Sequence, residues 1–336
     1  MTFTHDDRLT LRRWFLVCVL LAFVAACAEG QNYASHPAML AFTERLVDED
    51  GFEREELERL FAAAERQDSI LEAIARPAEK TKPWHEYRQI FVTDKRTRQG
   101  VAFMRKHGET LARAQTETGV PASIIAAILG VETFYGRITG SYRVVNALAT
   151  LAFDYPPRSD FFTRELRHFL ILTREQGLEP LALKGSYAGA MGYGQFMPSS
   201  YRSYAVDFDG DGSVDIWDNP VDAIGSVANY LKQHGWRPDE NIILPARRSG
   251  GIPDSWINAG LKPERSLAQL IAAGLEPLGD APDDALATGL AMQGDEDIEY
   301  WIGLHNFYVI TRYNHSAMYA LSVYQLSQRL QAELGE

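Results

Sequence analysis

Glu132 is the residue whose setting in the sequence most clearly suggests acid–base chemistry. It lies near the end of an apolar segment, residues 122–135, whose composition predicts a helix. Leu129, Ile128 and Ile125 precede it by three, four and seven positions and therefore share its helical face. Because apolar surroundings disfavour a charged carboxylate, we expect the pKa of Glu132 to be raised. A carboxylic acid that keeps its proton near neutral pH can donate it to a glycosidic oxygen.

The same position is also compatible with a structural glutamate that is ion-paired or caps the helix end. Enzymes that hydrolyse glycosides usually need a second carboxylate in addition to the acid. The spacing of acidic residues along this chain does not single one out. The residues near Glu132 therefore suggest an acid but leave the rest of the reaction open.

A glycine-rich stretch, residues 185–200, is the second candidate for chemistry. It has four glycines within its first ten positions, which allow the backbone to approach another group closely. Ser186 and Gln195 supply hydrogen-bonding groups, and the tyrosine and phenylalanine residues supply flat apolar faces. This mixture suits a sugar, whereas a phosphate loop would need a lysine that is absent here. The alternative is a loop that is only tightly packed.

An acidic loop, residues 207–218, matches the calcium-binding loop of EF-hands at positions 1, 3, 5, 6 and 9. Gly212 occupies the position of the sharp turn, and Asp218 stands where a glutamate is usual, so Asp222 is an alternative last ligand. The candidate ligands are Asp207, Asp209, Asp211, Ser213 (through its carbonyl oxygen), Asp218 and Asp222. We expect a structural Ca²⁺ site here and no organic cofactor; the alternative is a solvated acidic turn.

The elements that must position these residues are mainly helical. Apolar residues recur at helical spacing from residue 38 onward. The predicted helices include 98–118, 122–135 with Gly136 as its C-cap, 144–153, 160–176, 221–234 and 316–330. Residues 241–297 are richer in proline, glycine and short apolar runs, which predicts a small mixed or β-containing part. The predicted fold class is therefore mainly α (α+β).

The charge and the cysteine content of the chain argue against some classes of function. The chain has 336 residues and a formal net charge of −12, which argues against a broad nucleic-acid-binding face. Its two cysteines, Cys18 and Cys27, both lie within the first 27 residues. The folded body therefore has no disulfide and no cysteine metal site.

The N-terminal residues predict a targeting segment. Arg12 and Arg13 precede an apolar run over residues 14–26, which is too short to span a bilayer because a helix needs about 20 residues. The sequence Val-Ala-Ala-Cys that ends at Cys27 resembles a bacterial lipoprotein box, which implies acylation of Cys27. Ala28 favours the outer membrane, by resemblance to Gram-negative lipoproteins. An ordinary signal peptide with an incidental cysteine is the alternative.

Together, these segments resemble the lytic murein transglycosylase B family, from about residue 38 to the end of the chain. The stretches that carry the resemblance are 128–133, 185–201, the loop from Asp207 that leads into 223–230, and 310–314. The local departures from the family pattern are Phe134-Tyr135 and an extra residue near Asn219. The second departure leaves the last calcium ligand open.

The resemblance implies a lysozyme-like helical core with an additional helical domain and a small β-containing domain. The implied division is a lipoprotein signal peptide over 1–26, a tether over 27–37, a helical domain over 38–110, a catalytic core with the calcium loop over 111–240, a small β-containing domain over 241–300 and a C-terminal part of the core over 301–336.

The resemblance also implies cleavage between N-acetylmuramic acid (MurNAc) and N-acetylglucosamine (GlcNAc) without water, which leaves a 1,6-anhydro end. Glu132 would act first as acid and then as base, while the substrate's own N-acetyl group stabilises the anomeric centre. This would explain why no second carboxylate stands out. Ser186 and Gln195 match family positions that line the cleft. Further, less strict matches to substrate-binding positions are Tyr87, Arg158, Tyr230 and Tyr313.

Two other functions remain open from the sequence. One is a true muramidase, in which water replaces the C6 hydroxyl. The other is a non-catalytic peptidoglycan-binding lipoprotein that acts as a scaffold. The expected partners are peptidoglycan glycan strands, the membrane through the lipid anchor, and proteins of cell-wall synthesis or division; nucleic acid is not expected. The expected location is the periplasm, anchored to the outer membrane.

Overall fold

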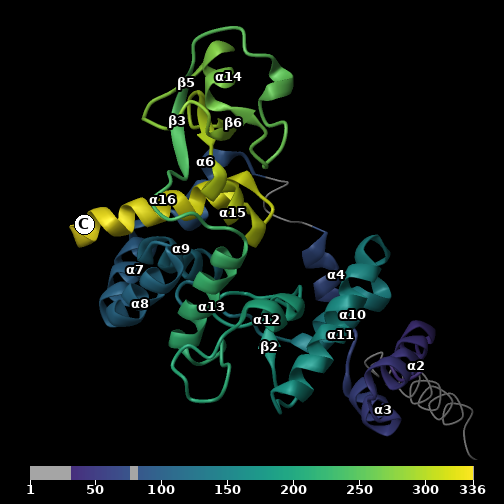
Figure 1. The fold of residues 1–336 in the computed structure, drawn as a ribbon. Helices are drawn as coiled ribbons and strands as arrows, with labels where there is room; N and C mark the ends of the chain where they lie inside the picture. The colour runs from purple at the N-terminus through teal and green to yellow at the C-terminus, as the bar shows by residue number, and fades with distance from the viewer. Residues whose placement is uncertain (1–31, 76–81, 336) are drawn as a thin grey trace, which may run out of the picture. The chain divides into compact units, whose positions relative to one another are not determined.

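The computed structural model describes residues 32–75 and 82–335. The chain divides into two compact units, Met1–Arg66 and Gln67–Glu336 (Figure 1). The predicted signal peptide and Cys27 lie outside the described residues.

The first unit contains two helices, α2 (Pro37–Asp50) and α3 (Arg54–Ala63). Helix α2 begins with a proline at its first position and ends at Gly51, which adopts the left-handed conformation with φ 65°. Phe42 and Phe61 meet edge to face with 6.1 Å between ring centroids, and both are buried. The helical periodicity predicted for this region is confirmed.

The second unit is built mainly from helices. They are α4 (Asp68–Ile74), α6 (Trp84–Phe91), α7 (Asp94–Lys106), α8 (Gly108–Thr118), α9 (Ala122–Thr133), α10 (Val144–Asp154), α11 (Ser159–Glu175), α12 (Pro198–Tyr204), α13 (Pro220–Gln233), α15 (His305–Tyr313) and α16 (Ala317–Leu334), with a 3-10 turn η1 at Pro156–Arg158. Helix α9 is the centre of the packing, because ten of its 12 residues are buried. Helices α7, α8, α13 and α16 all contact it.

Two details of the predicted helices are wrong. The segment 98–118 is not one helix, because α7 ends and α8 begins around His107, where the backbone leaves the helical region at φ −114° and ψ 26°. The helix that carries Glu132 ends at Thr133 rather than continuing to a glycine cap at Gly136. The helix ends earlier because Thr133 bonds the carbonyl of Tyr193, a residue far along the chain that the local sequence does not show.

The β-containing part is a five-stranded antiparallel sheet with strand order β4-β6-β7-β3-β5. Its strands are β3 (Ile243–Arg248), β4 (Arg265–Ser266), β5 (Leu275–Pro277), β6 (Leu286–Gln293) and β7 (Ile298–Gly303), and α14 (Leu267–Ala272) packs against them (Figure 1). Leu244, Leu270, Leu275 and Ile302 belong to its buried core. A separate two-stranded pair joins β1 (Tyr142–Arg143) to β2 (Lys184–Gly185). The prediction of a small β-containing part is confirmed.

The hairpin formed by β6 and β7 is fastened to helix α6. The indole N–H of Trp84, a residue only 1% exposed, donates to Glu299 Oε2 at 3.1 Å. Arg88 donates to Glu299 Oε1 at 3.2 Å and to Asp295 Oδ2 at 2.6 Å. Helix α6 in turn packs against α16. The hairpin is therefore tied to α6 through two carboxylates, and that of Glu299 accepts from two side chains.

This arrangement predicts that Glu299→Ala destabilises the second unit, because it leaves the buried indole N–H of Trp84 without its acceptor. The expected loss is about 1–3 kcal/mol in the free energy of unfolding, measured by urea denaturation. Glu276→Ala is the matched control, since Glu276 accepts from Ser249 and Arg247 at the sheet surface. Equal stability of the two variants would contradict the role of Glu299.

Candidate active site

The side chain of Glu132 is held by a phenol from the C-terminal helix. Glu132 lies in the last turn of α9 and is partly exposed. The hydroxyl of Tyr319, a residue only 2% exposed, donates to Glu132 Oε1 at 2.6 Å. Ser316 caps α16, because its hydroxyl oxygen accepts the backbone N–H of Tyr319 at 3.2 Å. The start of α16 therefore fixes the donor that the carboxylate needs.

Two tyrosines near Glu132 stay protonated. Burial, together with the negative charge of Glu132, raises the pKa of Tyr319 well above 10. The same two causes raise the pKa of Tyr313 well above 10. Because neither phenol ionises at physiological pH, Tyr319 remains a hydrogen-bond donor to the carboxylate.

The chain turns sharply after Glu132. Phe134 and Tyr135 have φ values of 54° and 62°, a left-handed conformation that costs roughly 1 kcal/mol or more for a residue other than glycine. Thr133 stabilises the turn: its hydroxyl donates to the carbonyl of Tyr193 at 2.8 Å and accepts the N–H of Gly136 at 2.9 Å. This is why the helix ends before the predicted glycine cap. The turn also joins the end of α9 to the glycine-rich stretch.

The ring of Phe134 is held between two cations of α7. The ammonium of Lys95 lies 5.7 Å from the ring centroid, and the guanidinium of Arg96 lies 4.9 Å from it. Arg96 also donates to the carbonyl of Ile90 at 2.5 Å. These contacts help to offset the backbone strain of the turn. The departure from the family pattern at Phe134-Tyr135 is therefore accommodated by neighbours from α7.

The glycine-rich stretch folds back on itself next to the end of α9. The Gln195 amide donates to the carbonyls of Thr139, at 3.1 Å, and of Gly192, at 3.0 Å. The hydroxyl oxygen of Ser186 accepts the N–H of Ala190 at 3.1 Å. The Ser186 hydroxyl proton and the Gln195 carbonyl oxygen take no part in these bonds, so each can serve a ligand. The stretch is thus tightly packed and still offers polar groups.

Aromatic side chains connect this stretch to Glu132. The hydroxyl of Tyr313, which is partly exposed, donates to the carbonyl of Gly194 at 2.6 Å. The rings of Tyr230 and Tyr313 lie 4.7 Å apart, and each lies 5.8 Å from Phe196. The Tyr230 hydroxyl donates to the Arg312 carbonyl at 2.5 Å. Phe196 and Tyr230 are buried, so Tyr313 is the member of this cluster that is partly exposed to a ligand.

The other two predicted residues occupy different places. Tyr87 is 1% exposed on α6 and interacts electrostatically with Tyr319, so it belongs to the group around Glu132. Arg158, in the turn η1, lies over the rings of Phe161 and Phe162, at 4.4 and 5.0 Å from their centroids. Contacts therefore connect Tyr87, Tyr230 and Tyr313 with the surroundings of Glu132, whereas Arg158 takes part in a separate set of contacts.

Tyr319 is a site residue that the sequence did not predict. It lies on the buried side of a predicted amphipathic helix, where a tyrosine is indistinguishable from an ordinary core aromatic. The only local signal is Ser316, whose type and position predict an N-cap three residues earlier.

The acidic loop brings three carboxylates together. Asp207, Asp209 and Asp211 each offer an oxygen atom, and these atoms lie within 4.8 Å of one another. Hydrogen bonds from three backbone N–H groups of the loop, that of Gly212 foremost, lower the pKa of Asp207. Such a set of convergent, charged oxygen atoms fits the ligand preference of Ca²⁺.

The two candidates for the last ligand differ in their surroundings. Asp222 is 0% exposed, and its two oxygens accept the N–H groups of Phe208 and Asp215, each at 2.7 Å. Burial raises the pKa of Asp222 despite these two donors. Asp218 is exposed, at the loop surface. Asp222 therefore holds the loop backbone through two hydrogen bonds from the buried side, whereas the side chain of Asp218 faces solvent.

Within residues 32–75 and 82–335, no helix combines the length and the apolar character that crossing a membrane requires.

Comparison with known proteins identifies the family. Residues 34–328 match the family described as Transglycosylase SLT domain. The chain is 45% identical over 309 residues to membrane-bound lytic murein transglycosylase B of Escherichia coli K12, covering 89% of this chain and 84% of that protein.

Solved structures of lytic transglycosylases are also similar to this chain. Soluble lytic transglycosylase SltB1 from Pseudomonas aeruginosa superposes with a TM-score of 0.85 at 55% identity, covering 89% of this chain and 100% of that one. Escherichia coli lytic transglycosylase Slt35, solved in complex with calcium, superposes with a TM-score of 0.84 at 44% identity, covering 91% and 96%. The chain therefore belongs to the transglycosylase SLT domain family and is a lytic transglycosylase that cleaves peptidoglycan.

Proposed function

We propose that this enzyme cleaves the MurNAc-β-1,4-GlcNAc bond without water and leaves 1,6-anhydro-MurNAc ends. The observation that carries the proposal is the hydrogen bond from the buried Tyr319 to the partly exposed Glu132. It fixes the position of the Glu132 carboxylate, which is still partly exposed to a ligand. One such group can serve the two proton transfers of the reaction in turn.

In the first step, protonated Glu132 donates its proton to the glycosidic oxygen, and the bond from that oxygen to C1 of MurNAc breaks. The carbonyl oxygen of the substrate's N-acetyl group stabilises the positive charge that develops at C1. The Glu132 carboxylate formed in this step keeps the hydrogen bond from Tyr319, which stabilises its charge.

In the second step, Glu132 accepts the proton of the C6 hydroxyl while the C6 oxygen attacks C1 and closes the anhydro ring. Glu132 is then protonated again, so no water is consumed and the cycle is complete. A muramidase would instead admit water at this step and leave reducing ends.

The remaining assignments belong to the same proposal. Ser186 and Gln195 would bind the sugars through hydrogen bonds. The other substrate-binding residues predicted from the sequence are Tyr87, Arg158, Tyr230 and Tyr313; Arg158 and Tyr313 are exposed enough to contact a sugar, whereas Tyr87 and Tyr230 are buried and would act through their neighbours. The Asp207 loop would hold a structural Ca²⁺, with Asp218 or Asp222 as the last ligand. The domain limits predicted from the sequence are retained, with residues 111–240 and 301–336 as the catalytic core.

The proposed location is the periplasm, where acylated Cys27 would anchor the enzyme to the outer membrane. The relative from Escherichia coli is described as membrane-bound, which supports membrane association. An anchored enzyme would act on the glycan strands near that membrane and would meet proteins of cell-wall synthesis or division there.

The first prediction concerns Glu132. The Glu132→Gln variant keeps the size of the side chain but cannot donate or accept the proton, so turnover should fall by at least about 100-fold. Release of soluble fragments from purified peptidoglycan measures turnover, and co-sedimentation with the same material measures binding, which should persist. Glu109→Gln, at an exposed position of α8, is the control.

Mass spectrometry of the wild-type products tests the reaction type in the same experiment. Anhydro ends are expected. Reducing ends would support the muramidase, and undiminished turnover of Glu132→Gln would refute the assignment of the acid. Binding without turnover by the wild-type chain would support the scaffold function instead.

The second prediction concerns Tyr319. Tyr319→Phe removes one hydrogen bond to a charged group, worth about 1.5–3 kcal/mol, so kcat should fall roughly 10- to 100-fold. Tyr324→Phe, a partly buried tyrosine of the same helix, should leave kcat unchanged. If the two variants have equal kcat values, Tyr319 does not assist Glu132.

The third prediction concerns the metal. Ca²⁺ at about 100 times its Kd should raise the Tm by roughly 5 °C, because it binds only the folded loop. The shift should be absent from Asp207→Asn, which weakens the carboxylate cluster. Mg²⁺ at the same concentration is the control ion. A Tm that is the same in chelator and in excess Ca²⁺ would contradict the metal site.

A further inference from the structure

The ring of Tyr135 fills a slot where helices α7, α9 and α16 meet. Tyr135 is only 7% exposed, although it belongs to the turn that follows Glu132. A methyl group added to Gly130 of α9 would lie 2.6 Å from the Tyr135 oxygen, and one added to Gly100 of α7 would lie closer still. The methyl group at Gly100 would also meet Leu330 of α16, at 2.5 Å. Two glycines on different helices therefore leave the space that this ring occupies.

Packing of the ring, and not a hydrogen bond of the hydroxyl group, keeps Tyr135 in this slot. The phenol oxygen is buried and has no hydrogen-bond partner among the described residues. Burial raises the pKa of Tyr135, so the phenol is neutral at physiological pH. The ring stacks on Phe103 of α7, with 5.4 Å between the ring centroids. The part of Tyr135 that the structure uses is therefore its aromatic ring.

The backbone of Tyr135 closes the end of α9 around Glu132. The N–H of Tyr135 donates to the carbonyl of Leu129 at 3.0 Å, and the N–H of Phe134 donates to the carbonyl of Gly130 at 3.1 Å. In the chain, Glu132 lies between these acceptors and these donors. A displacement of Tyr135 is therefore passed on to Glu132 through the two bonds that close the helix end.

Tyr135 is held in a backbone conformation that suits glycine better than tyrosine. Its φ of 62° lies in the left-handed region, where a residue with a bulky side chain is strained. Such a residue persists only where its surroundings hold it, and strained residues occur mainly at functional sites. A glycine here would relieve the strain but would leave the slot between the helices empty. The strain and the buried ring together point to a role for this side chain three residues after Glu132.

The hydrogen bond between Tyr319 and Glu132 depends on how closely α9 and α16 approach each other. Tyr319 of α16 donates to Glu132 Oε1 at 2.6 Å, and a hydrogen bond is lost once the two heavy atoms are about 3.6 Å apart. A movement of about 1 Å between the end of α9 and the start of α16 therefore breaks it. The ring of Tyr135 fills space among α7, α9 and α16, which contact one another, and so resists this movement.

We propose that Tyr135 is a positioning residue for the reaction: its ring, packed between Gly100 and Gly130, keeps Glu132 within hydrogen-bonding distance of Tyr319. Because its side chain is buried, Tyr135 acts through Glu132 and not on the substrate itself. The inference rests on the proposed function, which makes Glu132 the acid and the base.

Two substitutions separate the ring of Tyr135 from its hydroxyl group. Tyr135→Gly removes the ring where glycine fits the backbone, so kcat should fall roughly 10- to 100-fold, as in Tyr319→Phe. KM should stay within about twofold, because Ser186 and Gln195 are unchanged. Tyr135→Phe keeps the ring, so its kcat and KM should equal those of the wild type. Circular dichroism gives the temperature range in which each variant is folded, and the kinetics are measured within it.

Phe169→Ala is the control for loss of packing, since it removes a wholly buried ring from α11. It should lower the Tm and leave kcat unchanged at a temperature at which the variant is folded.

Two double variants test the route by which Tyr135 acts. Tyr135→Gly should lower kcat no further in a Tyr319→Phe background, because the hydrogen bond to Glu132 is already absent there. Gly130→Ala should lower kcat as Tyr135→Gly does, because the added methyl group displaces the ring. Gly130→Ala and Tyr135→Gly together should lower kcat no more than either change alone.

The inference is overturned if Tyr135→Gly keeps the wild-type kcat, if Tyr135→Phe loses as much activity as Tyr135→Gly, or if the losses of Tyr135→Gly and Tyr319→Phe multiply. An equal loss of kcat in Phe169→Ala would also overturn it, because any loss of packing would then have the same effect. Full activity of Glu132→Gln would instead refute the proposed function.

Discussion

The hydrogen bond between Tyr319 and Glu132 is the interaction on which the arrangement of the site depends. Helix α9 is almost wholly buried, so a carboxylate in its last turn needs a fixed donor. That donor comes from a residue 187 positions later in the chain. Helix α16 must therefore pack along α9 with its first turn at Glu132, and the cap at Ser316 sets where that turn begins. The C-terminal helix therefore completes the surroundings of Glu132 as well as the core.

The same constraint explains the strained turn after Glu132. The Thr133 hydroxyl lies 3.3 Å from the carbonyl of Leu129 in the preceding turn, as a threonine of a helix usually does. Because the helix ends at Thr133, this hydroxyl also reaches the carbonyl of Tyr193 and the N–H of Gly136. Tyr313 holds the next part of the glycine-rich stretch through the Gly194 carbonyl. The turn with its two left-handed residues thus holds Glu132 and the glycine-rich stretch next to each other.

The sequence predicted the parts of the site that depend on local patterns. The apolar helix of Glu132, the acidic loop and the final helix all have periodicities or spacings that are visible within 20 residues. It did not predict Tyr319, because a tyrosine on the buried face of an amphipathic helix carries no mark of its partner. The sequence also placed the predicted end of α9 too late, at Gly136, because glycine adopts the left-handed conformation most easily. The helix ends earlier because Tyr193 contacts Thr133, and Lys95 and Arg96 contact the ring of Phe134.

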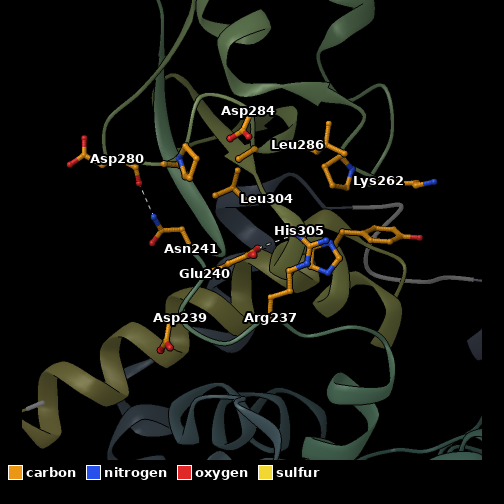
Figure 2. A pocket seen from close by; sticks show the side chains of 15 residues that line it. Arg237, Asp239, Glu240, Asn241, Lys262, Asp280, Asp284, Leu286, Leu304 and His305 are labelled. Atoms are coloured by element: carbon orange, nitrogen blue, oxygen red, sulfur yellow. Dashed lines mark hydrogen bonds and ion pairs between the residues drawn. The ribbon is translucent and has the colours of Figure 1, made fainter.

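The small β-sheet reaches the catalytic centre by two routes. Glu299 of β7 holds Trp84 and Arg88 of α6, the helix that carries Tyr87 to the vicinity of Tyr319. On its other side, the sheet forms one wall of a cavity of about 790 Å³, and the other wall includes His305, the first residue of α15, which ends at Tyr313 (Figure 2). The sheet therefore adjoins two of the helices that carry aromatic residues near Glu132, α6 and α15, and one rigid element can fix the position of both helices.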